Sequence, residues 1–73
     1  MDYPKMTENQ KIFYDGLDEA FEACSNDKHR VLNALSLYRN YILVNRKSKQ
    51  ALAYKQLTEK EVLEVINDYT LPY

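Results

Sequence analysis

Cysteine and histidine are almost missing from this sequence of 73 residues. Cys24 is the single cysteine, so no disulfide can form within one chain, and with the single histidine, His29, it cannot complete the usual four-ligand zinc site. A chain this short buries only about 60% of the surface that its unfolded form exposes. Small domains with so little core often gain stability from a disulfide, a metal or a partner. Self-association or binding to another protein is therefore the support we expect.

Glycine and proline are also scarce. Gly16 is the single glycine, and Pro4 and Pro72 lie near the two ends. One glycine cannot form a phosphate-binding loop, and a chain with so few turn residues favours helices over a β-sheet. A serine, an aspartate and a histidine within residues 25–29 resemble a catalytic set, but short polar residues at that place usually cap a helix. The sequence therefore predicts a protein that is not an enzyme, with no catalytic residues, metal or cofactor.

Long apolar runs are missing as well. No stretch approaches the roughly 20 apolar residues that span a bilayer. The polar start, MDYPKMTENQ, lacks the basic-then-apolar order of a secretory signal peptide. A single cysteine is compatible with a reducing compartment. We therefore expect a soluble, cytoplasmic protein that does not bind a membrane.

Acidic and basic residues, in contrast, are present in nearly equal number but are separated along the chain. Residues 1–27 contain seven acids and two bases, and residues 59–73 contain four acids and one base. Residues 28–58 contain seven bases and no acid. Such an arrangement indicates electrostatic pairing, either inside the molecule or with a partner.

Two helix starts are clear. Thr7 with Gln10 and Thr58 with Glu61 each form the Thr-x-x-Gln/Glu pattern of a capping box. A further start is expected near Asn26 or Asp27, because these side chains favour N-cap positions. Together with the apolar spacing, these signals predict helices at about 8–24, 28–46, 49–56 and 59–69.

Apolar residues recur at helical spacing in each predicted helix. Gly16 interrupts the first of these helices, and close packing of a neighbouring helix is the explanation we prefer. Leu32 and Leu43 lie within the polar arc of the second segment. The residues expected to face the interior are Phe13, Leu17, Ala20, Phe21 and Cys24, then Val31, Ala34, Leu35, Leu37, Tyr38, Tyr41, Ile42, Val44 and Leu52, and finally Val62, Leu63, Val65, Ile66 and Tyr69.

The middle of the chain allows two interpretations. An unbroken helix over residues 28–56 would be about 43 Å long, which two shorter helices cannot cover. We therefore expect a break within NRKSK at residues 45–49, with Ser48 as a new N-cap. The alternative is one long central helix that dimerises. The predicted fold is an all-α bundle of three to four helices, forming a single domain over residues 1–73 with short flexible ends at 1–6 and 70–73.

The segment YRNYILVNRKSKQALAYKQ, residues 38–56, carries five of the seven bases of residues 28–58 and interleaves them with tyrosine. Tyrosine and arginine are enriched at the centres of protein interfaces. The sequence therefore predicts a small protein-interaction module, acting as an adaptor, inhibitor or regulator, that docks on an acidic protein surface. The predicted contact residues are Arg39, Tyr41, Arg46, Lys47, Lys49, Tyr54 and Lys55.

Three alternatives accompany this prediction. The same basic face could bind nucleic acid, although the last helix, with its acidic outer side, is unsuited to reading the major groove. A homodimer is the second alternative. In the third, the bases serve only the fold, with Arg39, Arg46 and Lys55 pairing with Asp18, Glu22 or Glu64 along the helix seams, where exposed pairs contribute about 0–1 kcal/mol each.

Overall fold

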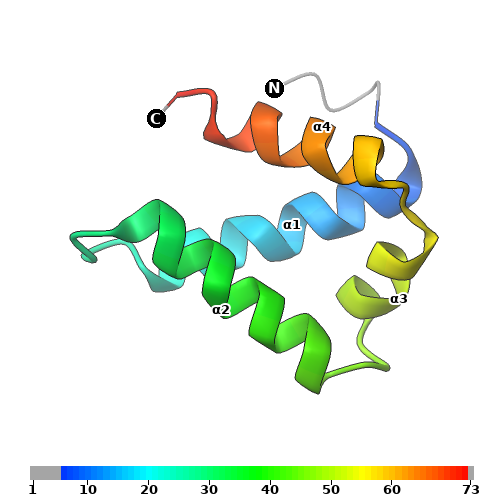
Figure 1. Ribbon diagram of the computed structural model, residues 1–73, viewed down its shortest axis with the longest axis horizontal. Coiled ribbons are helices and arrows are strands. Elements are labelled where there is room, and N and C mark those ends of the chain that lie inside the picture. Colours follow the sequence, from blue (N-terminus) through cyan, green and yellow to red (C-terminus); the bar gives the residue numbers. More distant parts are fainter. Residues whose placement is uncertain (1–5, 73) are drawn as a thin grey trace.

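The computed structural model describes residues 6–72, and the part that it describes contains four helices and no strand. The helices are α1 (Glu8–Ala23), α2 (Arg30–Val44), α3 (Lys49–Gln56) and α4 (Glu59–Thr70). The predicted all-α fold with four short helices is therefore confirmed, and the single long central helix is excluded. Figure 1 shows α1 behind the other helices, while α2 and α4 diverge in front of it toward the end where α3 lies.

The capping boxes at the starts of α1 and α4 form as predicted. In α1, the Thr7 hydroxyl accepts a hydrogen bond from the backbone N–H of Gln10, and the Gln10 side chain accepts one from the N–H of Thr7. Thr58 and Glu61 make the same reciprocal pair at the start of α4. Both starts follow from four consecutive residues, because a capping box satisfies exposed N–H groups locally.

The start of α2 differs from the prediction. Neither Asn26 nor Asp27 caps the helix; the N-cap is His29, which makes no capping hydrogen bond through its side chain. The helix instead begins where Arg30 Nε donates a hydrogen bond to the carbonyl oxygen of Phe21, 3.1 Å away, near the end of α1. The guanidinium group also lies over the Phe21 ring, 5.9 Å from its centroid. A contact between two helices thus sets the start of α2, and the local cap signal does not.

The break between α2 and α3 lies where NRKSK predicts it. Ser48 is the N-cap of α3, and its hydroxyl accepts a hydrogen bond from Ala51 N–H and donates one to the Asn45 carbonyl. The same side chain therefore closes the turn and begins the next helix. α2 ends at Val44, two residues before its predicted end at 46.

α1 is the centre of the bundle, because it packs against each of the other three helices. Phe21 and Leu17 are fully buried, as is Val65 of α4. The Phe21 ring lies 4.7 Å from the Tyr69 ring, centroid to centroid, and the Phe13 ring lies 5.0 Å from that of Tyr38. The other buried apolar residues are Met6, Phe13, Ala20, Ala34, Tyr38, Ala51 and Ala53.

Met6 is a part of the core that the sequence did not predict. It lies within the end 1–6 that was expected to be flexible, yet it packs into the same cluster as Phe13 and Val65. The rest of that end, residues 1–5, lies outside the described part of the chain. At the other end, α4 continues to Thr70, one residue beyond the predicted limit.

Gly16 allows α1, α2 and α3 to approach one another closely. A Cβ atom at this position would collide with the Tyr38 hydroxyl group and would lie 2.7 Å from Cγ of Gln50. The close-packing explanation for this glycine is therefore confirmed. The Tyr38 hydroxyl uses the space to donate a hydrogen bond to the Phe13 carbonyl oxygen at 2.8 Å.

Several residues predicted for the core are exposed instead. The arc of apolar residues on α2 is wider than the surface that α1 can cover, so α1 buries only Ala34 and Tyr38 at its centre. Cys24 is half-buried as a free thiol. Leu32 and Leu43, which lie within the predicted polar arc of α2, are exposed, as expected for residues on that arc. The residues that were predicted to face the interior but are exposed are Leu37, Tyr41, Val44, Leu52 and Leu63.

Candidate functional site

An apolar groove lies between α2 and α4. Its volume is about 460 Å³, and α1 forms its floor through Phe13 and Leu17. α2 and α4 scarcely touch each other, which leaves the groove open along its length. The walls and the α3 end are formed by Leu35, Tyr38, Arg39, Ile42, Leu43, Tyr54, Val62 and Ile66.

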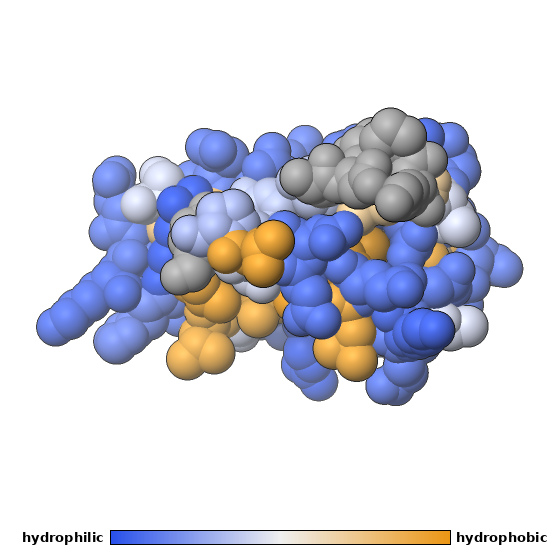
Figure 2. Space-filling model, turned by 90° about the horizontal axis from the view of Figure 1, so that it is seen from above, coloured by the Kyte–Doolittle hydropathy of each residue, from blue (hydrophilic) through white to orange (hydrophobic). Residues whose placement is uncertain are grey.

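Residues of this groove are only partly covered by the protein itself. Leu43 is 51% exposed and Tyr54 is 44% exposed. The Tyr54 ring stacks on Phe13 with 5.8 Å between centroids, so its orientation is fixed although it faces solvent. In Figure 2, hydrophobic side chains project along the lower edge of the view, which is the side nearest the reader in Figure 1. The protein thus leaves apolar groups of the groove accessible to solvent at Leu43 and Tyr54.

Arg39 is the one charged residue among those that line the groove in the described part of the chain, and no acid is among them. Arg46 and Lys47 follow on the α2–α3 turn, where both are exposed. The groove is therefore apolar at its floor and basic at its α2 side. Such a combination can accept apolar side chains and carboxylates from one partner.

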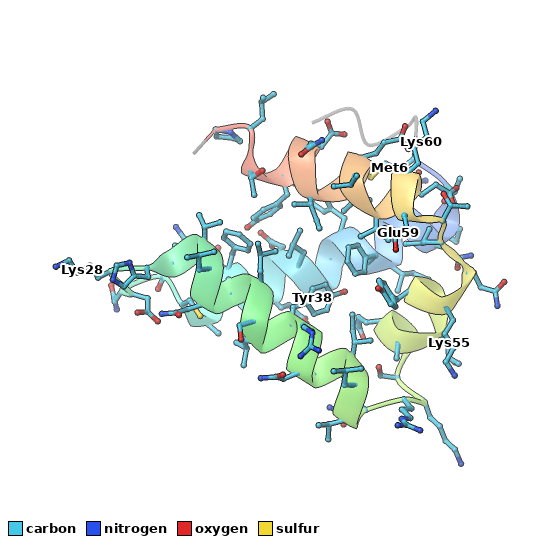
Figure 3. The ribbon with its side chains drawn as sticks, in the orientation of Figure 1. Met6, Lys28, Tyr38, Lys55, Glu59 and Lys60 are labelled. Atoms are coloured by element: carbon cyan, nitrogen blue, oxygen red, sulfur yellow. The ribbon has the colours of Figure 1, made fainter. Side chains whose placement is uncertain are left out.

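The seven predicted contact residues do not form one face. Arg39 and Tyr54 meet at the groove, while Tyr41 lies on the other flank of α2, beside Leu37 in a smaller hollow. Lys49 and Lys55 lie on the outer side of α3, where both border a third hollow that includes Ile12 and Leu52. Figure 3 shows Lys55 pointing outward from α3 and Tyr38 pointing into the space between α1 and α2. Of the seven residues, Arg39 and Tyr54 line the groove, and Arg46 and Lys47 are exposed on the turn between α2 and α3.

The predicted internal ion pairs are absent from residues 6–72. None of Arg39, Arg46 and Lys55 pairs with an acidic side chain there. Asp18 instead accepts a hydrogen bond of 2.7 Å from the Tyr69 hydroxyl. Glu64 accepts one of 3.2 Å from Gln10 Nε2, which also donates to the Glu61 carbonyl. Asp18 and Glu64 thus join α1 to α4. Arg39, Arg46 and Lys55 are left without an acidic partner within residues 6–72.

Gln10 has a second role that the sequence did not reveal. Besides closing the capping box of α1, its amide group reaches α4, which lies 51 residues later in the chain at Glu61. Gln10 is buried, and in the described part no buried side-chain polar atom lacks a hydrogen-bond partner. One residue therefore fixes both the first turn of α1 and the packing of α4 on it.

Within residues 6–72, Tyr38 is the residue whose pKa is clearly changed by its surroundings. Burial raises the pKa of its phenol well above the ordinary value of 10.0, and the nearby negative charge of Glu19 raises it further. The hydroxyl group therefore stays protonated and continues to donate to Phe13 in alkaline solution. This tyrosine supports the floor of the groove and is not a candidate acid or base.

The described part of the chain offers no ready metal site and no membrane span. No group of three histidine, cysteine, aspartate or glutamate side chains within residues 6–72 is placed to hold a metal ion. None of the four helices combines the length and hydropathy that a bilayer crossing requires. Comparison of the chain with protein-family models, with curated proteins and with solved structures finds no match.

Sequence reasoning missed the apolar half of this site. It assigned Leu35, Ile42, Val62 and Ile66 to a closed core, whereas these residues line an open groove. One signal was present: Leu43 interrupts the polar arc of its segment, next to Ile42. A pair of neighbouring apolar residues widens the apolar arc of a helix beyond what one packing partner covers.

Proposed function

We propose that this protein is a small, non-enzymatic protein-interaction module, an adaptor, inhibitor or regulator that docks on an acidic surface of another protein. The contact surface consists of Arg39, Arg46 and Lys47 together with Tyr54, where the groove meets the α2–α3 turn. We further propose that it works in the cytoplasm, where a free Cys24 would stay reduced.

The observation that carries this proposal is the exposure of three basic residues in the segment 28–58. Residues 28–58 contain no acid, and Arg39, Arg46 and Lys47 are exposed without an acidic partner inside residues 6–72. Bases that served only the fold would pair with acids of α1 and α4 such as Asp18 and Glu64, but these two accept hydrogen bonds from Tyr69 and Gln10. Exposed arginine beside exposed tyrosine is the composition typical of interface centres.

Charge reversal tests this proposal. We expect Arg46→Glu with Lys47→Glu to lower capture of the partner from a nuclease-treated lysate by about tenfold or more, the ratio that corresponds to ~1.4 kcal/mol of binding. Both residues are exposed on a turn, so circular dichroism should show unchanged helicity. The captured protein is then identified by mass spectrometry and its binding is measured directly.

The matched control changes the net charge equally at a distance from the groove. Lys28 lies in the turn before α2 and Lys60 lies in the first turn of α4, and Figure 3 shows both away from the α2–α3 turn. Lys28→Glu with Lys60→Glu should leave capture unchanged. Equal loss in both double variants would contradict a local contact surface. Capture that disappears with nuclease, with DNA or RNA binding that weakens steeply as salt rises, would favour the nucleic-acid alternative.

A further inference from the structure

The groove between α2 and α4 has the shape of a seat for one helix. On α2, its wall is formed at positions 35, 39, 42 and 43, and on α4 at positions 62 and 66. The α2 wall is about 12 Å long, which equals roughly two turns of an α-helix. Walls with residues four apart present ridges that fit side chains at the same spacing on a third helix.

A helix bound in the groove would cover apolar surface that the four helices leave exposed. α1 supplies a continuous apolar floor, but neither α2 nor α4 covers the groove from the front. A helix laid there would remove Leu43 and Tyr54 from water, and both are about half exposed. Because Tyr54 already stacks on Phe13, this end of the seat needs little ordering on binding.

The charge around the groove selects the kind of helix. Arg39 is its one charged lining residue within the described part, and Arg46 and Lys47 extend the positive charge beyond the end of α2. A partner helix with carboxylates along one flank would meet these bases, whereas a basic amphipathic helix would be repelled.

A second copy of this chain is less well suited to the groove. Its most acidic helix, α1, turns its apolar residues Phe13, Leu17 and Phe21 into its own core. A folded copy therefore cannot offer α1 as an amphipathic ligand without unfolding.

We propose that the groove binds one acidic amphipathic helix of a partner protein, with apolar side chains at i and i+4 inserted between α2 and α4 and carboxylates on Arg39. This inference rests on the proposed function and adds to it the apolar half of the contact and the conformation of the partner.

The experiment is a selection from a displayed library of helical peptides about four turns long, in which apolar, acidic and basic residues are randomised. We expect the enriched peptides to combine apolar residues at i, i+4 spacing with a net negative charge. In NMR spectra of the isotope-labelled protein, these peptides should shift the methyl signals of Leu35, Ile42, Val62 and Ile66. They should leave the signal of Leu32 in place.

Matched variants locate the contact. Leu43→Gln changes an exposed leucine in the groove, and Leu32→Gln changes a leucine of the same helix that is 72% exposed and outside the groove. We expect Leu43→Gln to weaken peptide binding by about tenfold and Leu32→Gln to leave it unchanged. Arg39→Glu should weaken acidic peptides similarly, while Lys28→Glu should not. Unchanged circular dichroism establishes that each variant is folded.

The outcomes separate this inference from the proposed function. Acidic peptides that lose binding with Arg46→Glu and Lys47→Glu but not with Leu43→Gln would overturn the groove and leave the proposed function standing. Enriched peptides without acidic residues would overturn the inferred partner chemistry. A dimer mass in light scattering that Leu43→Gln abolishes would assign the groove to a second copy and overturn the inference. If no peptide is enriched, the groove does not bind an acidic helix. If, in addition, no acidic protein is captured, the proposed function is wrong as well.

Discussion

α1 and α2 are nearly equal in length, but they use their apolar residues in opposite ways. α1 buries six residues because the other three helices surround it. α2 buries two, Ala34 and Tyr38, because α1 covers only the centre of its apolar arc. Its remaining apolar residues are half-buried or exposed, and three of them, Leu35, Ile42 and Leu43, line the groove. The comparison teaches that burial depends on how many neighbours a helix has. α1 therefore holds most of the core, and α2 carries much of the surface that we propose as the contact surface.

The largest expected effect comes from removing the centre of the α1 core. Phe21→Ala deletes a fully buried ring that contacts Tyr69 and Arg30. We expect the free energy of unfolding to fall by about 3–5 kcal/mol, a large part of the total for so small a domain.

Chemical denaturation followed by circular dichroism measures this loss. The control on α2 is Leu32→Ala, which should change the free energy of unfolding by less than about 0.5 kcal/mol because Leu32 is exposed. Similar decreases in the free energy of unfolding for Phe21→Ala and Leu32→Ala would contradict the conclusion that α1 holds the core and that α2 contributes little to it through its exposed side.

A smaller effect is expected where the two helices touch. In Gly16→Ala the new Cβ atom collides with the Tyr38 hydroxyl group and crowds Gln50. We expect a loss of about 1–3 kcal/mol from overpacking, although alanine favours the helix by about 1 kcal/mol. Thermal unfolding of both proteins gives the difference.

A double-mutant cycle sharpens the cause of that loss. Tyr38→Phe removes the oxygen atom that Gly16→Ala would meet first. The cost of Gly16→Ala should therefore be smaller in the Tyr38→Phe protein than in the natural one. Equal costs in the two backgrounds would mean that Gln50 or the Cζ atom of the ring at position 38, each 2.7 Å from the new Cβ atom and retained in Tyr38→Phe, causes the loss, and that the tyrosine hydroxyl does not.

The smallest effect concerns pH. Because burial raises the pKa of Tyr38 above 10.0, the unfolded chain releases this proton at a lower pH than the folded protein does. The stabilisation is fully present below pH 10 and decreases as the pH rises from there toward the folded pKa, by at most about 1.4 kcal/mol per pH unit from this group.

Unfolding measured between about pH 9 and 11 should show this decrease, and Tyr38→Phe should reduce its slope. A slope that is the same in Tyr38→Phe as in the natural protein would contradict a buried, protonated Tyr38 at the seam between α1 and α2.

Features that depend on a few neighbouring residues could be predicted from the sequence. Both capping boxes and the break at Ser48 form as predicted, because each involves hydrogen bonds across three positions. The all-α class and the inward face of α1 also followed from spacing, since a helix surrounded by neighbours buries its apolar stripe.

Features that depend on contacts between helices could not be predicted from the sequence. The start of α2 follows from the bond between Arg30 and Phe21, nine residues apart, which overrides the cap signal of Asn26 and Asp27. The predicted contact residues separate onto different flanks, because a helix spreads its side chains around its axis and the break after Val44 turns α3 away. The groove itself exists because α2 and α4 rest on α1 without meeting, and no local pattern records the distance between two helices that are far apart in the sequence.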